Sequence, residues 1–252
     1  MNLLNLFWLV PLSILVSMMI NHLADTLPIV RKMTLSPICT KCHQTFELSR
    51  YVLYKACPHC LTKPGNRRFL LPIVFIITYV LLYLLPPVYS GIHLSLIIVT
   101  FLYLVFIIDL EHRLILHPVS IFGAILFTII GLYLNGWQKT ILGGGIGFLI
   151  MYGLYLFGIL FSKWIAKKRG ETLDEVALGY GDVNLTAIFG LLFGWPRIAV
   201  LLFFTILLGG IFSAVYMLIL KVRKRYELFT PIPYAPFLII SALLLMYIST
   251  PK

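Results

Sequence analysis

The chain has 252 residues, of which 60% are hydrophobic and 12% charged, and its mean hydropathy is +0.99. Soluble domains hold about 45–50% apolar and about 25% charged residues, so this composition excludes an ordinary soluble domain and indicates a membrane protein. The formal net charge of +11 would fit a nucleic-acid-binding protein, but the placement of the basic residues gives another explanation.

Eight apolar runs follow one another along the chain, and each approaches the roughly 20 residues that a helix needs to cross a bilayer. The runs cover residues 3–24, 69–89, 92–109, 117–134, 140–162, 177–195, 197–220 and 233–250. They predict an all-α polytopic membrane protein with about eight transmembrane helices. The first run lacks a basic start and a following small-residue cleavage site, so we expect a retained helix rather than a cleavable signal peptide.

These runs divide the chain into three predicted parts. Residues 1–24 form the first transmembrane helix, residues 25–68 a polar and basic segment, and residues 69–252 a seven-helix membrane domain. Glycines gather in this domain at Gly143, Gly144, Gly145 and Gly147. Small residues let membrane helices approach closely, so this run predicts a tight helix–helix contact.

The basic residues predict an orientation. If the helices alternate and residues 25–68 lie in the cytoplasm, 17 of the 20 basic residues fall on the inner side. The outer side keeps only Lys139, Arg197 and Lys252. This is the positive-inside pattern of membrane proteins, which makes nucleic-acid binding unnecessary as an explanation and directs both termini outward.

All four cysteines lie in the cytoplasmic segment, as two Cys-x-x-Cys pairs with fourteen residues between them: Cys39, Cys42, Cys57 and Cys60. Two such pairs can place four thiolates around one structural Zn²⁺. Two disulfides or four unrelated thiols are the alternatives, but disulfides are not expected on a cytoplasmic face. His43 and His59 lie beside the cysteines and are possible substitute ligands. Metal binding would supply much of the folding free energy of so polar a segment.

Two of the nine acidic residues lie at apolar runs. Most of the others, Asp25 among them, fall in the cytoplasmic segments, where solvated charge needs no explanation. Asp109 ends the third run, and Asp182 lies near the start of the sixth. An ionisable group at a membrane span is costly and therefore a functional candidate. Because the runs alternate in direction, both aspartates are predicted near the cytoplasmic face.

Two carboxyls in close contact share a proton, because ionising both is costly. One can act as a general base on water while the other donates a hydrogen bond to a substrate carbonyl, which is the chemistry of aspartic proteolysis. The alternative is that Asp109 and Asp182 are ordinary interfacial charges. Glu111 and His112 compete with Asp109 for this role, although Glu111 lies two residues beyond the apolar run.

At these residues the chain resembles the type IV prepilin peptidases, a group of GxGD membrane aspartic proteases. Ile108-Asp109 and the polar stretch to His117-Pro118 are similar to the first aspartate motif of this family. Gly179-Tyr180-Gly181-Asp182 is similar to its GxGD motif, and Pro231 to Phe237, which includes Pro233 and Pro236, to its proline-rich entry to the last helix. Two Cys-x-x-Cys pairs after the first span are also a family feature.

The resemblance implies a defined activity. Asp109 and Asp182 would be the catalytic pair of an endopeptidase. Its motif and substrate-positioning residues would be Gly179, Gly181, Pro233 and Pro236. Its substrates would be prepilins or pseudopilins, cut at the cytoplasmic face of the bacterial inner membrane in a pilus, secretion or DNA-uptake pathway. The substrate helix would enter sideways from the lipid bilayer.

Many family members also methylate the new N-terminus with S-adenosylmethionine. This chain departs from that pattern, with Thr26 before Leu27-Pro28 where an arginine is usual and Phe69-Leu70-Leu71 in place of a Tyr-Pro stretch that leads to a glutamate. It also has Asn184 where lysine is usual. S-adenosylmethionine is therefore an expected cofactor only if the methyltransferase is retained.

Two other functions fit the same residues. A transporter with a zinc-stabilised cytoplasmic loop could use the paired carboxylates as a proton relay, but no inverted repeat relates the halves of the chain. A catalytically inactive scaffold for pilus assembly would share the fold and cleave nothing.

Overall fold

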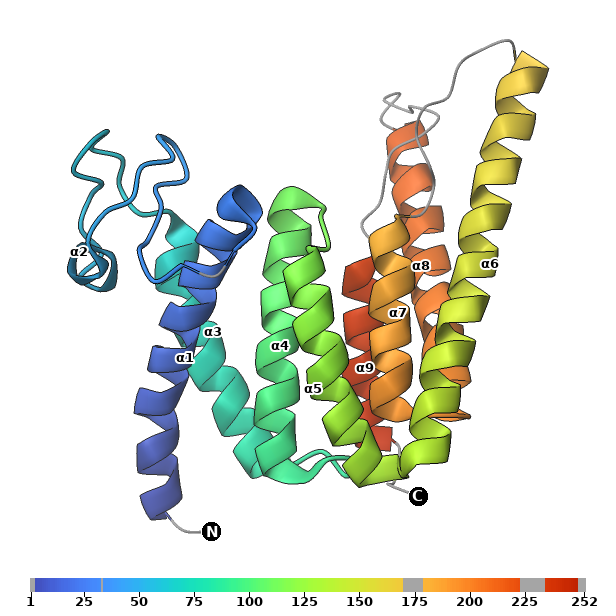
Figure 1. Ribbon diagram of the computed structural model, residues 1–252, viewed down its shortest axis with the longest axis horizontal. Helices are drawn as coiled ribbons and strands as arrows, with labels where there is room; N and C mark the ends of the chain where they lie inside the picture. The colour runs from blue at the N-terminus through green and yellow to red at the C-terminus, as the bar shows by residue number, and fades with distance from the viewer. Residues whose placement is uncertain (1–2, 33, 170–178, 223–233, 249–252) are drawn as a thin grey trace. The chain divides into compact units, whose positions relative to one another are not determined.

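The computed structural model describes residues 3–32, 34–169, 179–222 and 234–248, and within them the chain is helical apart from one isolated antiparallel bridge between Ile38 and Thr45. The helices are shown in Figure 1: α1 (Leu3–Val30), α2 (Leu48–Val52), α3 (Asn66–Leu84), α4 (Gly91–His112), α5 (His117–Asn135), α6 (Trp137–Arg169), α7 (Tyr180–Phe193), α8 (Arg197–Val222) and α9 (Ala235–Ile248). The prediction of an all-α polytopic membrane protein is confirmed. Each of the eight apolar runs corresponds to one helix, and α2 is the additional short helix of the cysteine segment.

Six of the described helices, α1, α3, α4, α5, α6 and α8, are long and apolar enough to cross a membrane. The other two apolar helices, α7 and α9, have 14 residues each, or about 21 Å at 1.5 Å per residue. They are shorter than the runs that predicted them. For α7 the far end has a local cause, because Gly194 takes φ +70° and Pro196 follows. A left-handed glycine and a proline both stop a helix.

The chain forms two compact units, Met1–Pro118 and Val119–Lys252, and each is described by itself. In the first unit α1 packs against α3 and α4. The packed face of α1 carries polar side chains at four-residue intervals, at most 5% exposed: Ser13, Ser17, Asn21 and Asp25. Four-residue spacing brings side chains to one helix face, so this helix has a polar stripe turned toward its neighbours. The predicted division at residues 24 and 68 stays a prediction.

In the second unit α6 and α7 make the closest helix–helix contact, as the glycine run predicted. A Cβ atom on Gly190 of α7 would come within 2.2 Å of the Gly143 carbonyl oxygen, and one on Gly143 within 2.4 Å of the Gly190 carbonyl oxygen. No side chain fits at either position, so the two backbones touch. Gly145, in the same run, faces open space instead. The contact fixes the helix that carries Asp182.

Gly190→Ala is expected to destabilise the protein by about 1–3 kcal/mol, because the added methyl group overpacks the α6–α7 contact. Thermal unfolding in detergent measures the effect. Gly145→Ala is the matched control, since its methyl group meets nothing within 4 Å and alanine favours a helix over glycine. Equal melting temperatures for the two variants would contradict the contact.

Candidate active site and metal centre

The two Cys-x-x-Cys pairs form two loops of the same conformation. In each loop the N–H of the first cysteine donates to the carbonyl five residues later, and its carbonyl accepts the N–H four residues later, at 2.9–3.0 Å. The residue after the second cysteine, His43 or Leu61, is left-handed, with φ of 57° and 56°. This backbone curls each loop so that both of its thiols point inward.

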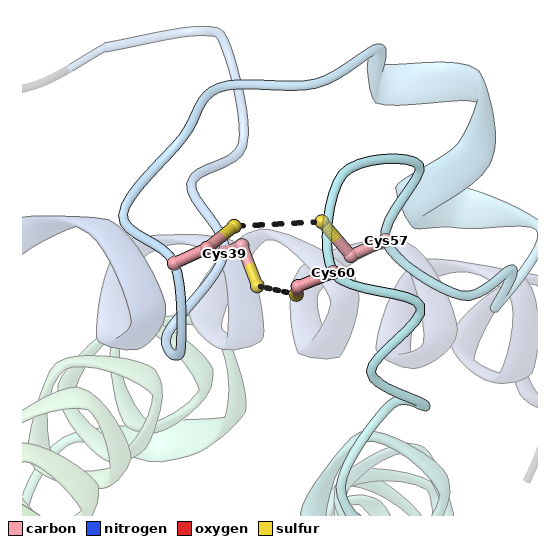
Figure 2. Close-up of side chains that lie close together, drawn as sticks. Cys39, Cys57 and Cys60 are labelled. Carbon is pink, nitrogen blue, oxygen red and sulfur yellow. Dashed lines mark hydrogen bonds between the residues drawn. The ribbon is translucent and has the colours of Figure 1, made fainter.

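The four thiols converge on one point. Sγ of Cys39 lies 3.5 Å from Sγ of Cys60, Sγ of Cys42 lies 3.8 Å from Sγ of Cys57, and all four sulfurs lie within 4.8 Å of one another. Figure 2 shows thiols from the two loops pointing toward one another. In a tetrahedral site with metal–sulfur bonds of about 2.3 Å, the sulfurs lie about 3.8 Å apart. The cluster therefore has the size of a four-cysteine metal site, and neither His43 nor His59 belongs to it.

The cysteines are free, not joined in disulfides, and the pKa values of Cys60 and Cys42 are shifted in opposite directions. Hydrogen bonds from the side chain and backbone of Thr62 lower the pKa of Cys60 to about 6. A backbone hydrogen bond with Gln44 acts to lower the pKa of Cys42, but burial and the neighbouring thiols outweigh it and raise that pKa to about 12. Four adjacent thiols cannot all ionise without a positive charge between them. A divalent cation would supply that charge.

Asp25, near the C-terminal end of α1, ties the cysteine segment to the helices. It is only 5% exposed. Its Oδ2 accepts hydrogen bonds from the Tyr51 hydroxyl at 2.7 Å and from Nη2 of Arg68 at 2.9 Å, and its Oδ1 pairs with Arg67. The Arg68 guanidinium also lies over the Tyr51 ring, 3.9 Å from the centroid. Because Tyr51 belongs to α2 and the arginines to α3, one carboxylate joins three helices.

The partners of Asp25 satisfy its buried charge, which would otherwise be strongly destabilising. Burial, and next the charge of Asp25, raise the pKa of Tyr51 above its ordinary value, so the hydroxyl stays a donor. The sequence interpretation of Asp25 as a solvated loop charge is wrong, because α1 continues to Val30 and carries the residue into the packed interior. The four-residue spacing of Ser13, Ser17 and Asn21 with Asp25 is the sequence signal that could have indicated this buried face.

Asp109 lies in the last turn of α4, in the first unit. It is 6% exposed, and within the described part of the chain its Oδ2 has no hydrogen-bond partner. Arg113 ends the helix in a left-handed conformation, with its N–H bonded to the Asp109 carbonyl at 2.8 Å. Glu111 and His112 are exposed by contrast. A buried carboxyl oxygen without a partner is costly and rare, which marks Asp109 rather than Glu111 as a candidate functional group.

Asp182 lies in the first turn of α7, in the second unit, and is 9% exposed. Gly179 precedes the helix in an extended conformation, and its N–H donates to the Asp182 carboxylate at 3.3 Å. The Asp182 N–H donates in return to the Gly179 carbonyl at 3.1 Å. The Asp182 carboxylate thus accepts a hydrogen bond at the positive end of the α7 dipole, where an anion is favoured.

Of the other predicted motif residues, two lie in the first turns of helices. Gly181 lies within the first turn of α7, Pro236 lies in the first turn of α9, and Pro233 lies outside the described residues. Because Asp109 and Asp182 belong to separate units, the pairing of their carboxyls stays a prediction. The four cysteines are the predicted residues that the structure brings together.

Comparison with known proteins identifies a related family. Residues 96–214 match the type IV leader peptidase family, a span that contains Asp109 and Asp182 and excludes the cysteines. Over 141 residues the chain is 31% identical to a prepilin leader peptidase/N-methyltransferase of Legionella pneumophila, which covers 56% of this chain and 44% of that protein. The protein of the same name from Stutzerimonas stutzeri is 30% identical over 141 residues, which covers 53% of this chain and 42% of that one.

The Bacillus subtilis protein of that name is 29% identical over 103 residues, or 41% of this chain and 34% of that one. The chain thus matches less than half the length of each of these relatives. No solved structure matches the chain. The comparisons give no support to a transporter.

Tyr51→Phe is expected to loosen the cysteine segment, because it removes the hydrogen bond to buried Asp25 and leaves the ring under Arg68. A bond to a charged group contributes about 1.5–3 kcal/mol, so limited proteolysis between residues 34 and 65 should run at least about tenfold faster. Tyr54→Phe is the control, since its hydroxyl donates to the Arg68 backbone carbonyl at 3.2 Å and not to a charge. If Tyr51→Phe resists protease like the wild type, Asp25 does not anchor the segment.

Proposed function

Because residues 96–214 match the type IV leader peptidase family, we propose that the chain is a membrane aspartic endopeptidase that removes the basic leader from type IV prepilins or pseudopilins. The observation that carries the proposal is that the matched span contains both candidate aspartates, each buried at a helix end. Burial at the edge of an apolar helix is where a functional carboxyl is expected in a membrane protein.

The surroundings of the two aspartates support different roles for them. Asp182 accepts the Gly179 N–H at the start of α7, where the helix dipole stabilises a carboxylate. Asp109 lies at the carbonyl end of α4 and its Oδ2 has no donor among the described residues, so a protonated carboxyl suits it better. We assign Asp182 as the general base and Asp109 as the general acid.

In this mechanism Asp182 takes a proton from a water molecule as the water oxygen attacks the scissile carbonyl carbon. Asp109 donates its hydrogen to the carbonyl oxygen, where negative charge develops. When the tetrahedral intermediate collapses, the C–N bond breaks and Asp182 passes its proton to the leaving amine. The hydroxyl hydrogen returns to Asp109 as the carbonyl re-forms. The reaction consumes one water molecule and needs neither a metal nor a covalent intermediate.

We further propose that the chain lies in the bacterial inner membrane with both aspartates and the cysteine segment on the cytoplasmic side. The long apolar helices support a multi-pass membrane protein. The excess of basic residues on one predicted face supports the orientation. The basic leader of a prepilin, which is synthesised in the cytoplasm, would then meet the site on the cytoplasmic side.

The four cysteines are proposed to hold one structural Zn²⁺. The spacing of the sulfurs fits the edge of a tetrahedral thiolate site, and the two matching loops present two thiols each. Bound zinc would cross-link the two loops and stabilise the segment. Four thiolate ligands leave no open position, so the ion takes no part in peptide cleavage.

Methylation is not part of the proposal. The names of the relatives include an N-methyltransferase, and S-adenosylmethionine would be its cofactor. Thr26, the stretch Phe69-Leu70-Leu71 and Asn184 depart from the family pattern. The departures at Thr26 and Phe69-Leu70-Leu71 bear on the second activity, and all three spare Asp109 and Asp182 themselves, so the proposed peptidase chemistry keeps its two carboxyls.

Asp109→Asn and Asp182→Asn are each expected to lower leader removal by at least about 100-fold, because each removes a proton-transfer group. Mass spectrometry of the N-terminus of a co-expressed prepilin measures the cleavage and reports any added methyl group. Glu47→Gln, which changes an exposed carboxylate bonded only to Ser49 in the described structure, is the control and should cleave normally. Normal cleavage by both aspartate variants would exclude the proposed mechanism.

The purified protein is expected to contain about one zinc ion per chain, measured by plasma mass spectrometry. Cys57→Ser removes a ligand and should abolish the metal. His59→Ser changes a neighbouring side chain that lies outside the cluster, and it should keep the metal. A zinc content that is the same in both variants would rule out the four-cysteine site.

A further inference from the structure

Arg67, the second residue of α3, contacts the ends of two other helices. Its Nε donates to the Asn21 side chain of α1 at 3.1 Å. One terminal nitrogen pairs with Asp25 of α1, and the other pairs with Glu111 of α4. The guanidinium is planar and rigid, so its three bonds fix the positions of their partners together.

The α1 side of this arrangement is firmly held. Asn21 and Asp25 are 2% and 5% exposed, and Asp25 is also bound by Arg68 and Tyr51. The Arg67 head group therefore has a fixed anchor. A charged side chain that is fixed in place restrains its ion-pair partner far better than a mobile surface charge does.

Glu111 is that partner, and it follows Asp109 by two residues in the last turn of α4. Its side chain is 41% exposed and lines a cavity of about 240 Å³ together with Arg67 and His112. Asp109 itself makes no hydrogen bond through Oδ2 in the described structure. Without a hydrogen bond at Oδ2, the position of the Asp109 carboxyl depends on the helix that carries it.

We propose that Arg67 is a positioning residue for the peptidase, which holds the last turn of α4 through Glu111 and thereby sets the placement of the Asp109 carboxyl. This inference rests on the proposed function of Asp109. A displacement of about 1 Å of a catalytic group can reduce a rate about 100-fold. Arg67 thus acts on the chemical step and not on the affinity for substrate.

Arg68 provides the matched comparison. It is the neighbouring arginine, it pairs with the same Asp25, and it contacts Tyr51 of the cysteine segment. Its recorded side-chain bonds do not reach α4. Loss of Arg68 should weaken the cysteine segment and leave the end of α4 in place.

The test compares wild type, Arg67→Gln, Glu111→Gln, the double variant and Arg68→Gln in full-length protein with a prepilin substrate. Arg67→Gln and Glu111→Gln should each lower kcat about tenfold with KM within about twofold, because the loss concerns chemistry alone. The double variant should be no slower than the slower single variant, since both changes break one link. Arg68→Gln should keep kcat within about twofold of wild type.

Hydrogen exchange of the peptide spanning residues 105–116 supplies a readout independent of activity. Its amides should exchange about tenfold faster in Arg67→Gln and Glu111→Gln than in wild type or Arg68→Gln. Glu111 is partly solvated, so Glu111→Gln should fold even if Arg67→Gln does not. Unchanged exchange, unchanged kcat or multiplying losses in the double variant would each overturn the inference. If the wild type cleaves no prepilin, only the proposed function fails. Hydrogen exchange still tests whether Arg67 holds the last turn of α4.

Discussion

The first unit depends on the charge balance around one buried carboxylate, Asp25. Placing a carboxylate in a packed helical interior is tolerated only when donors surround it. Two arginines and a tyrosine do so here, and they come from the start of α3 and from the cysteine segment. The same contacts that satisfy the charge therefore join α1, α2 and α3. Stability and assembly of this unit have a common origin.

Asp109 shows the opposite treatment of the same chemical group. Its burial is similar to that of Asp25, yet among the described residues its Oδ2 lacks the donors that Asp25 collects. A protein that can satisfy one buried carboxyl and leaves another incomplete has kept the second available for a different partner. The difference separates a structural carboxylate from a candidate catalytic one on physical grounds. Arg67 connects their surroundings, because it pairs with Asp25 and with Glu111, which follows Asp109 by two residues.

The apolar runs predicted the eight apolar helices, six of them long enough to cross a membrane, because backbone hydrogen bonding in lipid leaves few alternatives. Cysteine spacing likewise predicted the cluster, since each Cys-x-x-Cys loop forms from residues close together in the sequence. Asp25 was misjudged because a residue at the edge of an apolar run is buried or solvated according to its partners, and Arg67 and Arg68 lie 42 and 43 residues away. The length of α7 depends on the backbone geometry at Gly194, which hydropathy does not report. The pairing of Asp109 with Asp182 remains a prediction, because the two residues belong to separate units.

The shortness of α7 has a bearing on how water could reach a site in lipid. At about 21 Å, the helix falls well below the roughly 30 Å of a hydrocarbon core. Protein rather than lipid covers most of α7, because most of its residues are buried and α6, α8 and α9 pack against it, so its ends can stop short of the membrane surface. Asp182 occupies one of those ends, in the first turn. In the proposed hydrolysis, the short helix would let water approach the Asp182 carboxylate from the membrane surface.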